Sequence, residues 1–185
     1  MADDHSILYF SGIHVIESLR PNDEKTEQNL YNDFLKHQPT RYDGLHVDLK
    51  VVSQKDEFLQ YLKSLRDTSF VYDYNPIIHI EAHGCEDGIQ LTSYEVVKWD
   101  EIEPILREIN VAKNMNLLVT MGTCKGGYFT KRMTPPDYAP VFGIVGPLQD
   151  IDSPKLEASF SEFYQELLRS FNISKAIQRI ANASN

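Results

Sequence analysis

The stretch Ile77-Ile-His-Ile-Glu-Ala-His-Gly84 is an apolar run that ends in His83-Gly84, and a second apolar run, from Leu117 to Thr123, is followed directly by Cys124. Short apolar runs of this kind are typical of buried strands in a parallel sheet. The carboxyl ends of parallel strands meet at one edge, where the loops that follow them form the crevice that binds ligands. The two runs therefore predict a histidine and a cysteine at the same edge of a sheet.

The rest of the chain alternates between apolar runs and segments of helical periodicity, which is the pattern of βαβ units. The expected strands are Ile7 to Ile16, His46 to Val52, Pro76 to His83, Leu117 to Thr123 and Val141 to Val145, with Gly88 to Thr92 as a short strand or hairpin arm. The expected helices are Thr26 to His37, Lys55 to Leu65, Trp99 to about Asn110, Leu156 to Phe171 and Ser174 to Ala183, and Tyr128 to Pro140 is expected to be a loop. This order predicts an α/β three-layer sandwich with a mostly parallel central sheet flanked by helices.

The composition restricts the classes of protein to consider. A chain of 185 residues is long enough for one domain with a sizeable core, so we expect a single domain over 1–185. The formal charge of -9 would repel a phosphate backbone, and no basic stripe offsets it, so we expect no nucleic-acid partner. No apolar run approaches the ~20 residues that span a bilayer, and residues 1–6 lack the pattern of a signal peptide. We therefore expect a cytoplasmic protein without membrane contact.

A cysteine reacts as its thiolate, so a nucleophilic cysteine needs a neighbour that accepts or stabilises the thiol proton. His83 is the candidate base for Cys124, because its strand is expected to lie beside the cysteine strand. The backbone N–H groups of Gly84 and Cys124 are candidate oxyanion donors. Gly126 and Gly127 would leave room for a substrate backbone, although glycines after a strand are also ordinary turn residues. The competing interpretation is that Cys124 is an inert, buried thiol.

A metal site is a second interpretation of the histidine-rich strand. His79, Glu81 and His83 alternate along it and therefore share one face of the sheet. Ligands two residues apart on a strand lie about 7 Å from each other, too far for all three to bind one ion without distortion. We therefore expect no metal, a hydrogen-bonded His79 within the sheet, and a Glu81 that orients a neighbour or pairs with a basic group.

Several segments together carry a resemblance to a known family. They are Ile78 to Gly84, Asp87 to Leu91, Leu117 to Gly126, Val141 to Gly146, and a following helix with Phe160, Phe163, Tyr164 and Leu167. In them the chain resembles the caspase-like cysteine peptidases of the caspase–hemoglobinase fold, and among these the bacterial branch of CHAT domains, shared with separase. The likeness covers Ile7 to Ala181 in the order of elements and Pro76 to Gly127 in motif.

The resemblance implies a caspase-like fold in which a Cys-His dyad hydrolyses peptide bonds through a thioester intermediate, without a cofactor. Cys124 would be the nucleophile, His83 the general base and acid, and Gly84 with Cys124 the oxyanion donors. Family habit also implies a bacterial antiviral defence or signalling system in which a regulatory partner protein senses the trigger. The residues before Cys124 depart from the pattern, because relatives often carry a small residue directly before the cysteine and sometimes an acidic or amide residue two positions before it, where this chain has Gly122.

Two other functions remain open. The chain could be a catalytically silent caspase-like module that binds a partner protein, or a different small α/β hydrolase or nucleotide-binding domain. The last alternative is disfavoured because Phe10-Ser-Gly-Ile-His14, after the start of the first strand, contains a single glycine and no phosphate-binding motif.

The acidic residues near the expected site predict its substrate. Loops carrying Glu86, Asp87, Asp150 and Asp152 would favour a protein or peptide with a cationic residue before the scissile bond. The alternative is that these acids form a solvated rim and that Lys125, Lys131 and Arg132 favour acidic substrates. The connection from Tyr128 to Pro140 contains Pro135-Pro136, which leaves little slack for cleavage. We therefore expect control by a partner rather than by proteolytic maturation, and an isolated chain that stays uncut and weakly active.

Overall fold

The computed structural model describes residues 6–23, 30–132 and 138–183. Its strands join into one seven-stranded sheet with the parallel order β2 (His46–Val51), β1 (Gly12–Ser18), β3 (Pro76–Cys85), β6 (Leu118–Gly122) and β7 (Gly143–Val145). The remaining two strands, β4 (Gly88–Gln90) and β5 (Val96–Lys98), run antiparallel and extend from the end of β3. The expected, mostly parallel sheet is therefore confirmed.

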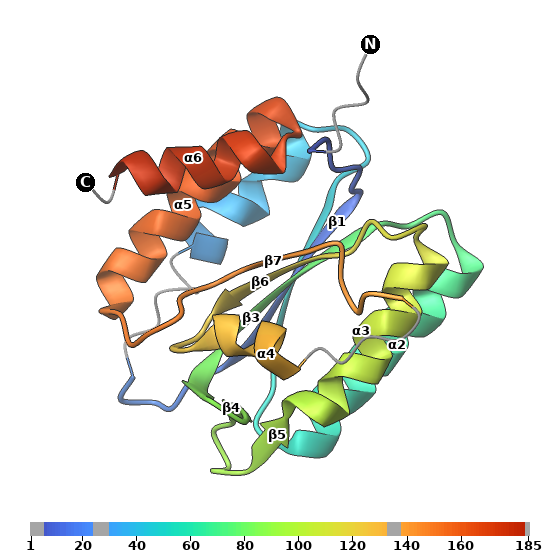
Figure 1. The fold of residues 1–185 in the computed structure, drawn as a ribbon. Helices are drawn as coiled ribbons and strands as arrows, with labels where there is room; N and C mark the ends of the chain where they lie inside the picture. Colours follow the sequence, from blue (N-terminus) through green and yellow to red (C-terminus); the bar gives the residue numbers. More distant parts are fainter. Residues whose placement is uncertain (1–5, 24–29, 133–137, 184–185) are drawn as a thin grey trace.

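Helices cover both faces of the sheet (Figure 1). On one face lie α2 (Lys55–Val71) and α3 (Trp99–Ala112), and on the other lie α5 (Ser153–Ser170) and α6 (Ile173–Ala183). Each face has its own apolar core, because alternate residues of a buried strand point to opposite sides. Ile78 and Ile80 of β3 belong to the core beneath α2 and α3, whereas Ile77 belongs to the core beneath α5. This arrangement is the predicted three-layer sandwich.

The first strand and the connection after it differ from the sequence prediction. β1 begins at Gly12 rather than Ile7, since Ile7 instead makes an isolated bridge with Asn172. The helix expected over 26–37 is, from Leu30 on, a π-helical turn (Leu30–Phe34) followed by a 3-10 turn, Leu35–Thr40. Residues 26–29 lie outside the described part. Pro39 in the last turn lacks the N–H that a continuing helix needs, which explains why no regular α-helix persists there.

The prediction of a loop from Tyr128 to Pro140 is also wrong, because this connection starts as a helix. Gly126–Tyr128 form a 3-10 turn, η3, and Phe129–Arg132 continue it as α4. Phe129 explains the helical turn, since its buried ring packs edge-on against Trp99. Residues 133–137, with Pro135-Pro136, lie outside the described part, so the expected stiffness of that segment remains a prediction.

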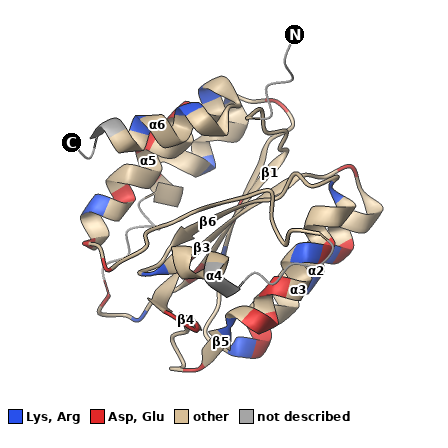
Figure 2. Ribbon diagram, viewed as in Figure 1, with Lys and Arg blue, Asp and Glu red and all other residues tan. Residues whose placement is uncertain are grey.

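Lys, Arg, Asp and Glu residues lie mainly on the helices and loops, and few lie on the central strands (Figure 2). Acidic residues occupy the first turns of both α2 and α3, where they complement the positive end of the helix dipole. In the described part of the chain, no helix has the length and apolar character needed to cross a membrane.

Candidate functional site

Strands β3 and β6 deliver the predicted histidine and cysteine to one edge of the sheet. They are parallel neighbours, and their paired register ends with Glu81 opposite Gly122. His83 and Cys124 each lie two residues further along their own chain segments, so both are at the carboxyl edge. The register of two parallel strands thus places the two residues in corresponding positions.

Gly84 is the closest link between the two segments. A Cβ added at Gly84 would overlap the carbonyl oxygen of Cys124, so any other residue there would push the two backbones apart. The glycine is therefore needed for close approach of backbone to backbone. This contact also places the backbone N–H groups of the two proposed oxyanion donors at the same edge.

The His83 side chain is 43% exposed, and its Nε2 lies 2.8 Å from Oδ2 of Asp23. Asp23 belongs to the loop after β1, and its Oδ2 also accepts a hydrogen bond of 2.7 Å from the backbone N–H of Arg20. Partial burial acts to raise the pKa of Asp23, but the hydrogen bonds from Arg20 and His83 outweigh it, so the pKa lies below its usual value. The carboxylate therefore stays ionised beside the imidazole.

The sequence analysis missed Asp23. The available signal was its position: an acidic residue in the loop after the first expected strand must lie at the edge where the other strands end. Pairing of β1 with β3, with Ser18 opposite Ala82, brings that loop beside His83. The link could not be deduced from spacing, because sixty residues separate Asp23 from His83.

Cys124 lies in the turn after β6 and is partly buried. Its Sγ is 4.0 Å from the carbonyl oxygen of Ile151, a weak contact. Within the described residues, the thiol makes no hydrogen bond to His83. The next residue, Lys125, has a left-handed backbone with φ of 57°, and this turns the chain directly into η3. The cysteine thus sits at a sharp strand-to-helix turn.

The two glycines after Cys124 serve the packing of this turn. A Cβ at Gly126 would overlap the Met121 side chain and lie 2.7 Å from Oγ1 of Thr123. The N–H of Gly127 donates to the carbonyl oxygen of Pro147 at 2.9 Å, and both glycines are buried. These contacts favour the turn interpretation over a role in making room for substrate.

A guanidinium not assigned from the sequence also lies at this edge. Arg20 donates a hydrogen bond of 2.6 Å from Nη2 to Oε1 of Gln90 in β4, and its Cζ lies 4.3 Å from the centre of the Tyr94 ring. Ser18 Oγ accepts a hydrogen bond from the Thr92 N–H at 3.0 Å. Hydrogen bonds from the last residue of β1 and from the loop after it therefore hold this loop against β4 and the turn that follows β4.

The four acids predicted to bind substrate lie in two loops. Glu86 and Asp87 form the exposed turn between β3 and β4, where their carbonyl oxygens accept hydrogen bonds from Nε1 and the backbone N–H of Trp99. Asp150 lies 4.0 Å from Lys125, and Asp152 lies 3.2 Å from Lys155 at the start of α5. Exposed pairs of this kind contribute little energy.

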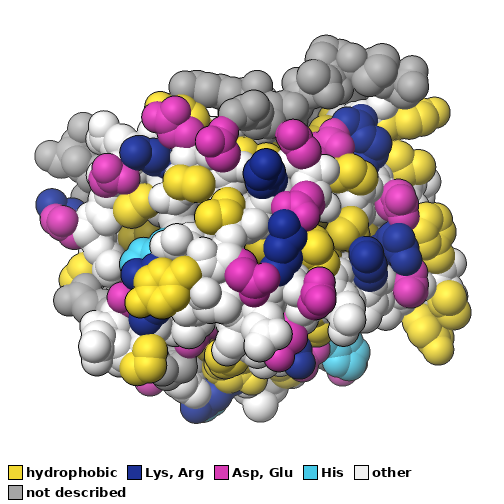
Figure 3. Space-filling model, turned by 90° about the horizontal axis from the view of Figure 1, so that it is seen from below, with side chains coloured by type: hydrophobic (Ala, Val, Ile, Leu, Met, Phe, Trp, Pro, Cys, Tyr) yellow, Lys and Arg dark blue, Asp and Glu magenta, His cyan; other side chains and the backbone are white. Residues whose placement is uncertain are grey.

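Figure 3 shows the end of the molecule at which β4 and β5 lie, with acidic and basic side chains interspersed and no broad patch of one sign. Any preference for a charged substrate must therefore come from individual residues close to His83 and Cys124 rather than from the charge of the whole face.

His79 is part of the core rather than of the site. It is fully buried, its Nδ1 lies 2.7 Å from Thr120 Oγ1, and its ring packs edge-on against Phe160 at 4.8 Å between centroids. Burial lowers the pKa of His79 to about 3, so its imidazole is neutral. This confirms the hydrogen-bonded histidine expected in the sheet. The described residues contain no group of three or more His, Cys, Asp or Glu side chains arranged to hold a metal ion.

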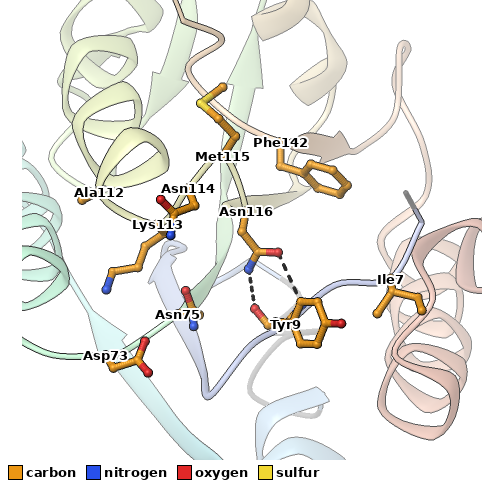
Figure 4. Close-up of a pocket in the computed structure, with 10 residues that line it drawn as sticks. All are labelled: Ile7, Tyr9, Asp73, Asn75, Ala112, Lys113, Asn114, Met115, Asn116 and Phe142. Atoms are coloured by element: carbon orange, nitrogen blue, oxygen red, sulfur yellow. Dashed lines mark hydrogen bonds between the residues drawn. The ribbon is translucent and has the colours of Figure 1, made fainter. Parts of the chain in front are cut away.

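A cavity of about 590 Å³ lies at the opposite, amino edge of the sheet (Figure 4). Tyr9 and Asn116 meet there through two hydrogen bonds between the Asn116 side-chain amide and the Tyr9 backbone. The cavity lining contains no histidine or cysteine, so its chemistry differs from that of the carboxyl edge. No family model matches the chain, and no curated protein sequence has significant similarity to it.

Proposed function

We propose that this protein is a caspase-like cysteine endopeptidase that uses Cys124 as the nucleophile and His83 as the base. The observation that carries the proposal is the backbone contact between Gly84 and Cys124, which holds the two reactive residues at the carboxyl edge of adjacent strands. A cysteine and a histidine in that position match the requirements of acyl transfer by an activated thiol.

In the proposed reaction, His83 removes the proton of Cys124, and the thiolate attacks the carbonyl carbon of the scissile peptide bond. The backbone N–H groups of Gly84 and Cys124 stabilise the oxyanion of the tetrahedral intermediate. His83 then gives its proton to the leaving amine, which produces a thioester. A water molecule deprotonated by His83 hydrolyses the thioester and restores the thiol.

A cysteine-directed probe tests the dyad directly, and Cys85 is its internal reference because both cysteines are free and partly buried. Iodoacetamide should label Cys124 faster than Cys85, and His83→Ala should slow the labelling of Cys124 alone. Peptide mapping by mass spectrometry distinguishes the two sites. Equal labelling rates that His83→Ala leaves unchanged would contradict the proposal.

A catalytically silent module that binds a partner protein is the second candidate. The observation in its favour is that the described thiol contacts the Ile151 carbonyl oxygen while the imidazole contacts Asp23, so neither reactive group engages the other. The same labelling experiment separates the two candidates, because a silent module has no need for an activated thiolate.

We propose a cationic residue before the scissile bond, supported by the acidic turn at Glu86 and Asp87. Fluorogenic peptides with Arg, Lys, Asp or Asn at that position provide the test. Cleavage after Asp alone would reverse the charge argument and favour the Arg20 and Lys125 side of the edge.

Control by a regulatory partner, within a bacterial antiviral defence or signalling system, is also part of the proposal and rests on the family resemblance. A cytoplasmic location fits the two free thiols. The isolated chain should run as a single uncut band with weak activity. Quantitative cleavage within residues 128–140, with a gain in activity that Lys131→Ala/Arg132→Ala prevents, would contradict partner control.

A further inference from the structure

We infer that Asp23 is the positioning residue of the site: its carboxylate holds His83 in the orientation and tautomer that a base for Cys124 requires. The inference rests on the proposed function for the role of His83, but the contact on which it stands is independent of any activity. It adds a third member to the expected dyad, from an element that neither the cysteine nor the histidine belongs to.

The hydrogen-bond chemistry of the contact fixes the tautomer of His83. An ionised carboxylate can only accept hydrogen bonds, and Oδ2 of Asp23 lies 2.8 Å from Nε2 of His83. The proton of a neutral His83 must therefore be on Nε2. The lone pair is then on Nδ1, which is the nitrogen available to take the thiol proton.

Asp23 is itself held in place. The backbone N–H of Arg20 donates to the same Oδ2 at 2.7 Å, and the Arg20 side chain is anchored on Gln90 and on the Tyr94 ring. A carboxylate fixed by a backbone donor loses little freedom when it orients a neighbour. The side chain of Asp23 is 22% exposed, so bulk water does not fully screen the pair.

Asp23 also stabilises the charge that His83 acquires during the proposed reaction. When His83 takes the proton from Cys124 Sγ, it becomes an imidazolium with protons on both nitrogens. Asp23 remains ionised and stabilises this cation across the Nε2–H bond, as an orienting carboxylate does in a catalytic triad. The thiolate then carries the negative charge that reacts with substrate, and no proton has to leave the His83–Asp23 pair.

Two substitutions separate orientation from charge. Asp23→Asn keeps an oxygen that can accept from both Arg20 N–H and His83 Nε2, but removes the negative charge. Asp23→Ala removes both. Asp33→Asn, at an exposed position of the π-helical turn Leu30–Phe34, is the matched control, because it deletes one acidic charge outside the Asp23–His83 pair.

Nitrogen chemical shifts of the His83 ring, assigned with His83→Ala, report the tautomer at neutral pH. The wild type and Asp33→Asn should show the Nε2–H form, Asp23→Asn should retain it, and Asp23→Ala should show a mixture. Alkylation of Cys124 should slow by at least about tenfold in Asp23→Ala and by less in Asp23→Asn. In peptide hydrolysis the loss should appear in kcat with KM unchanged, because Asp23 touches the base and not the substrate.

The outcomes distinguish this inference from the proposed function. If Asp23→Ala keeps the Nε2–H tautomer and the wild-type alkylation rate while remaining folded, the role of Asp23 is refuted whatever the activity. If His83→Ala leaves Cys124 alkylation unchanged, the dyad is refuted. If the His83 tautomer nevertheless changes in Asp23→Ala, the contact orients His83 but does not activate Cys124. Thermal unfolding of each variant establishes that the fold is retained.

Discussion

The two ends of the central sheet differ in what their polar groups contact. At the carboxyl edge, Asp23 and His83 contact each other, and Cys124 lies in the turn after the neighbouring strand β6. At the amino edge, side chains contact the backbone: Lys113 Nζ donates to the Tyr72 carbonyl oxygen at 2.7 Å, and Asn116 binds Tyr9. The amino edge holds a cavity of about 590 Å³, and the carboxyl edge holds the proposed reactive residues.

If the proposed dyad is the site, the cavity at the amino edge does not mark it. At the amino edge Asn110 also accepts from the Leu117 N–H at 2.9 Å and donates to the Ala139 carbonyl oxygen at 2.8 Å. Such bonds satisfy backbone groups where strands begin, which is a structural task. An extended peptide substrate, by contrast, can bind along an exposed edge, so a peptidase site needs no enclosed cavity.

Removing the proposed reactive groups should have the largest effect. Cys124→Ala and His83→Ala should each lower peptidase activity by at least about a thousandfold, because a nucleophile and its base act as a unit. The double variant should be no worse than either single variant. Hydrolysis of a fluorogenic peptide measures the loss, and circular dichroism checks the fold. Near-normal turnover by Cys124→Ala would move the chemistry away from this edge.

The second largest effect is expected for Gly84→Ala. The added Cβ would meet the carbonyl oxygen of Cys124, a backbone atom that cannot rotate away. We expect a loss of about 3 kcal/mol in the free energy of unfolding, at the upper end for overpacking, together with slower alkylation of Cys124.

Gly143→Ala on β7 is the control for that substitution. Its added Cβ would lie 3.3 Å from Cδ1 of Ile173, the flexible end of a side chain, so the cost should be small. Equal unfolding curves for Gly84→Ala and the wild type would mean that β3 and the turn after β6 are not held in contact.

The third test separates the core histidine from the edge histidine on the same strand. The pKa of His79 is about 3 in the folded protein, against 6.5 for an unperturbed histidine, so between these values the unfolded state binds the extra proton. Stability is therefore full above pH 6.5 and falls as the pH drops toward 3. This group should cost about 2 kcal/mol between pH 6.5 and 4.5.

Urea unfolding at the two pH values measures that cost. His79→Gln can keep a hydrogen bond to Thr120 but does not titrate, so the acid sensitivity of the variant should be smaller by the same amount. An unchanged acid sensitivity would show that His79 is hydrated or charged in the folded protein.

The smallest effect is expected at the amino edge. Asn116→Ala removes the two hydrogen bonds to the Tyr9 backbone, in an exposed setting, and should lower the free energy of unfolding by about 1 kcal/mol. Labelling of Cys124 should keep the wild-type rate, since Asn116 and Cys124 lie at opposite ends of the sheet. A large change in that rate would show that the two ends are coupled.

Much of the fold was readable from the sequence, because buried strands of a parallel sheet are nearly continuous apolar runs. Pro76–Cys85 and Leu118–Gly122 lie within a few residues of the predicted strands, and α5 lies close to its predicted range. The first strand was predicted too long: Leu8 is apolar because it is buried in the core beneath α5, while the backbones of Ile7 and Leu8 pair with Asn172 and Phe171 rather than with a strand of the sheet. Apolar character reports burial and does not report which partner buries the residue.

Local periodicity and the common direction of parallel strands were enough to predict the layers of this protein and the sheet edge that His83 and Cys124 share. Only the tertiary structure decided that Asp23 contacts His83, that Gly84 lies against Cys124, and that His79 stays neutral in the core. Those facts depend on which strands become neighbours. The order of strands in a sheet depends on the whole chain, so no single stretch of sequence encodes which strands lie side by side.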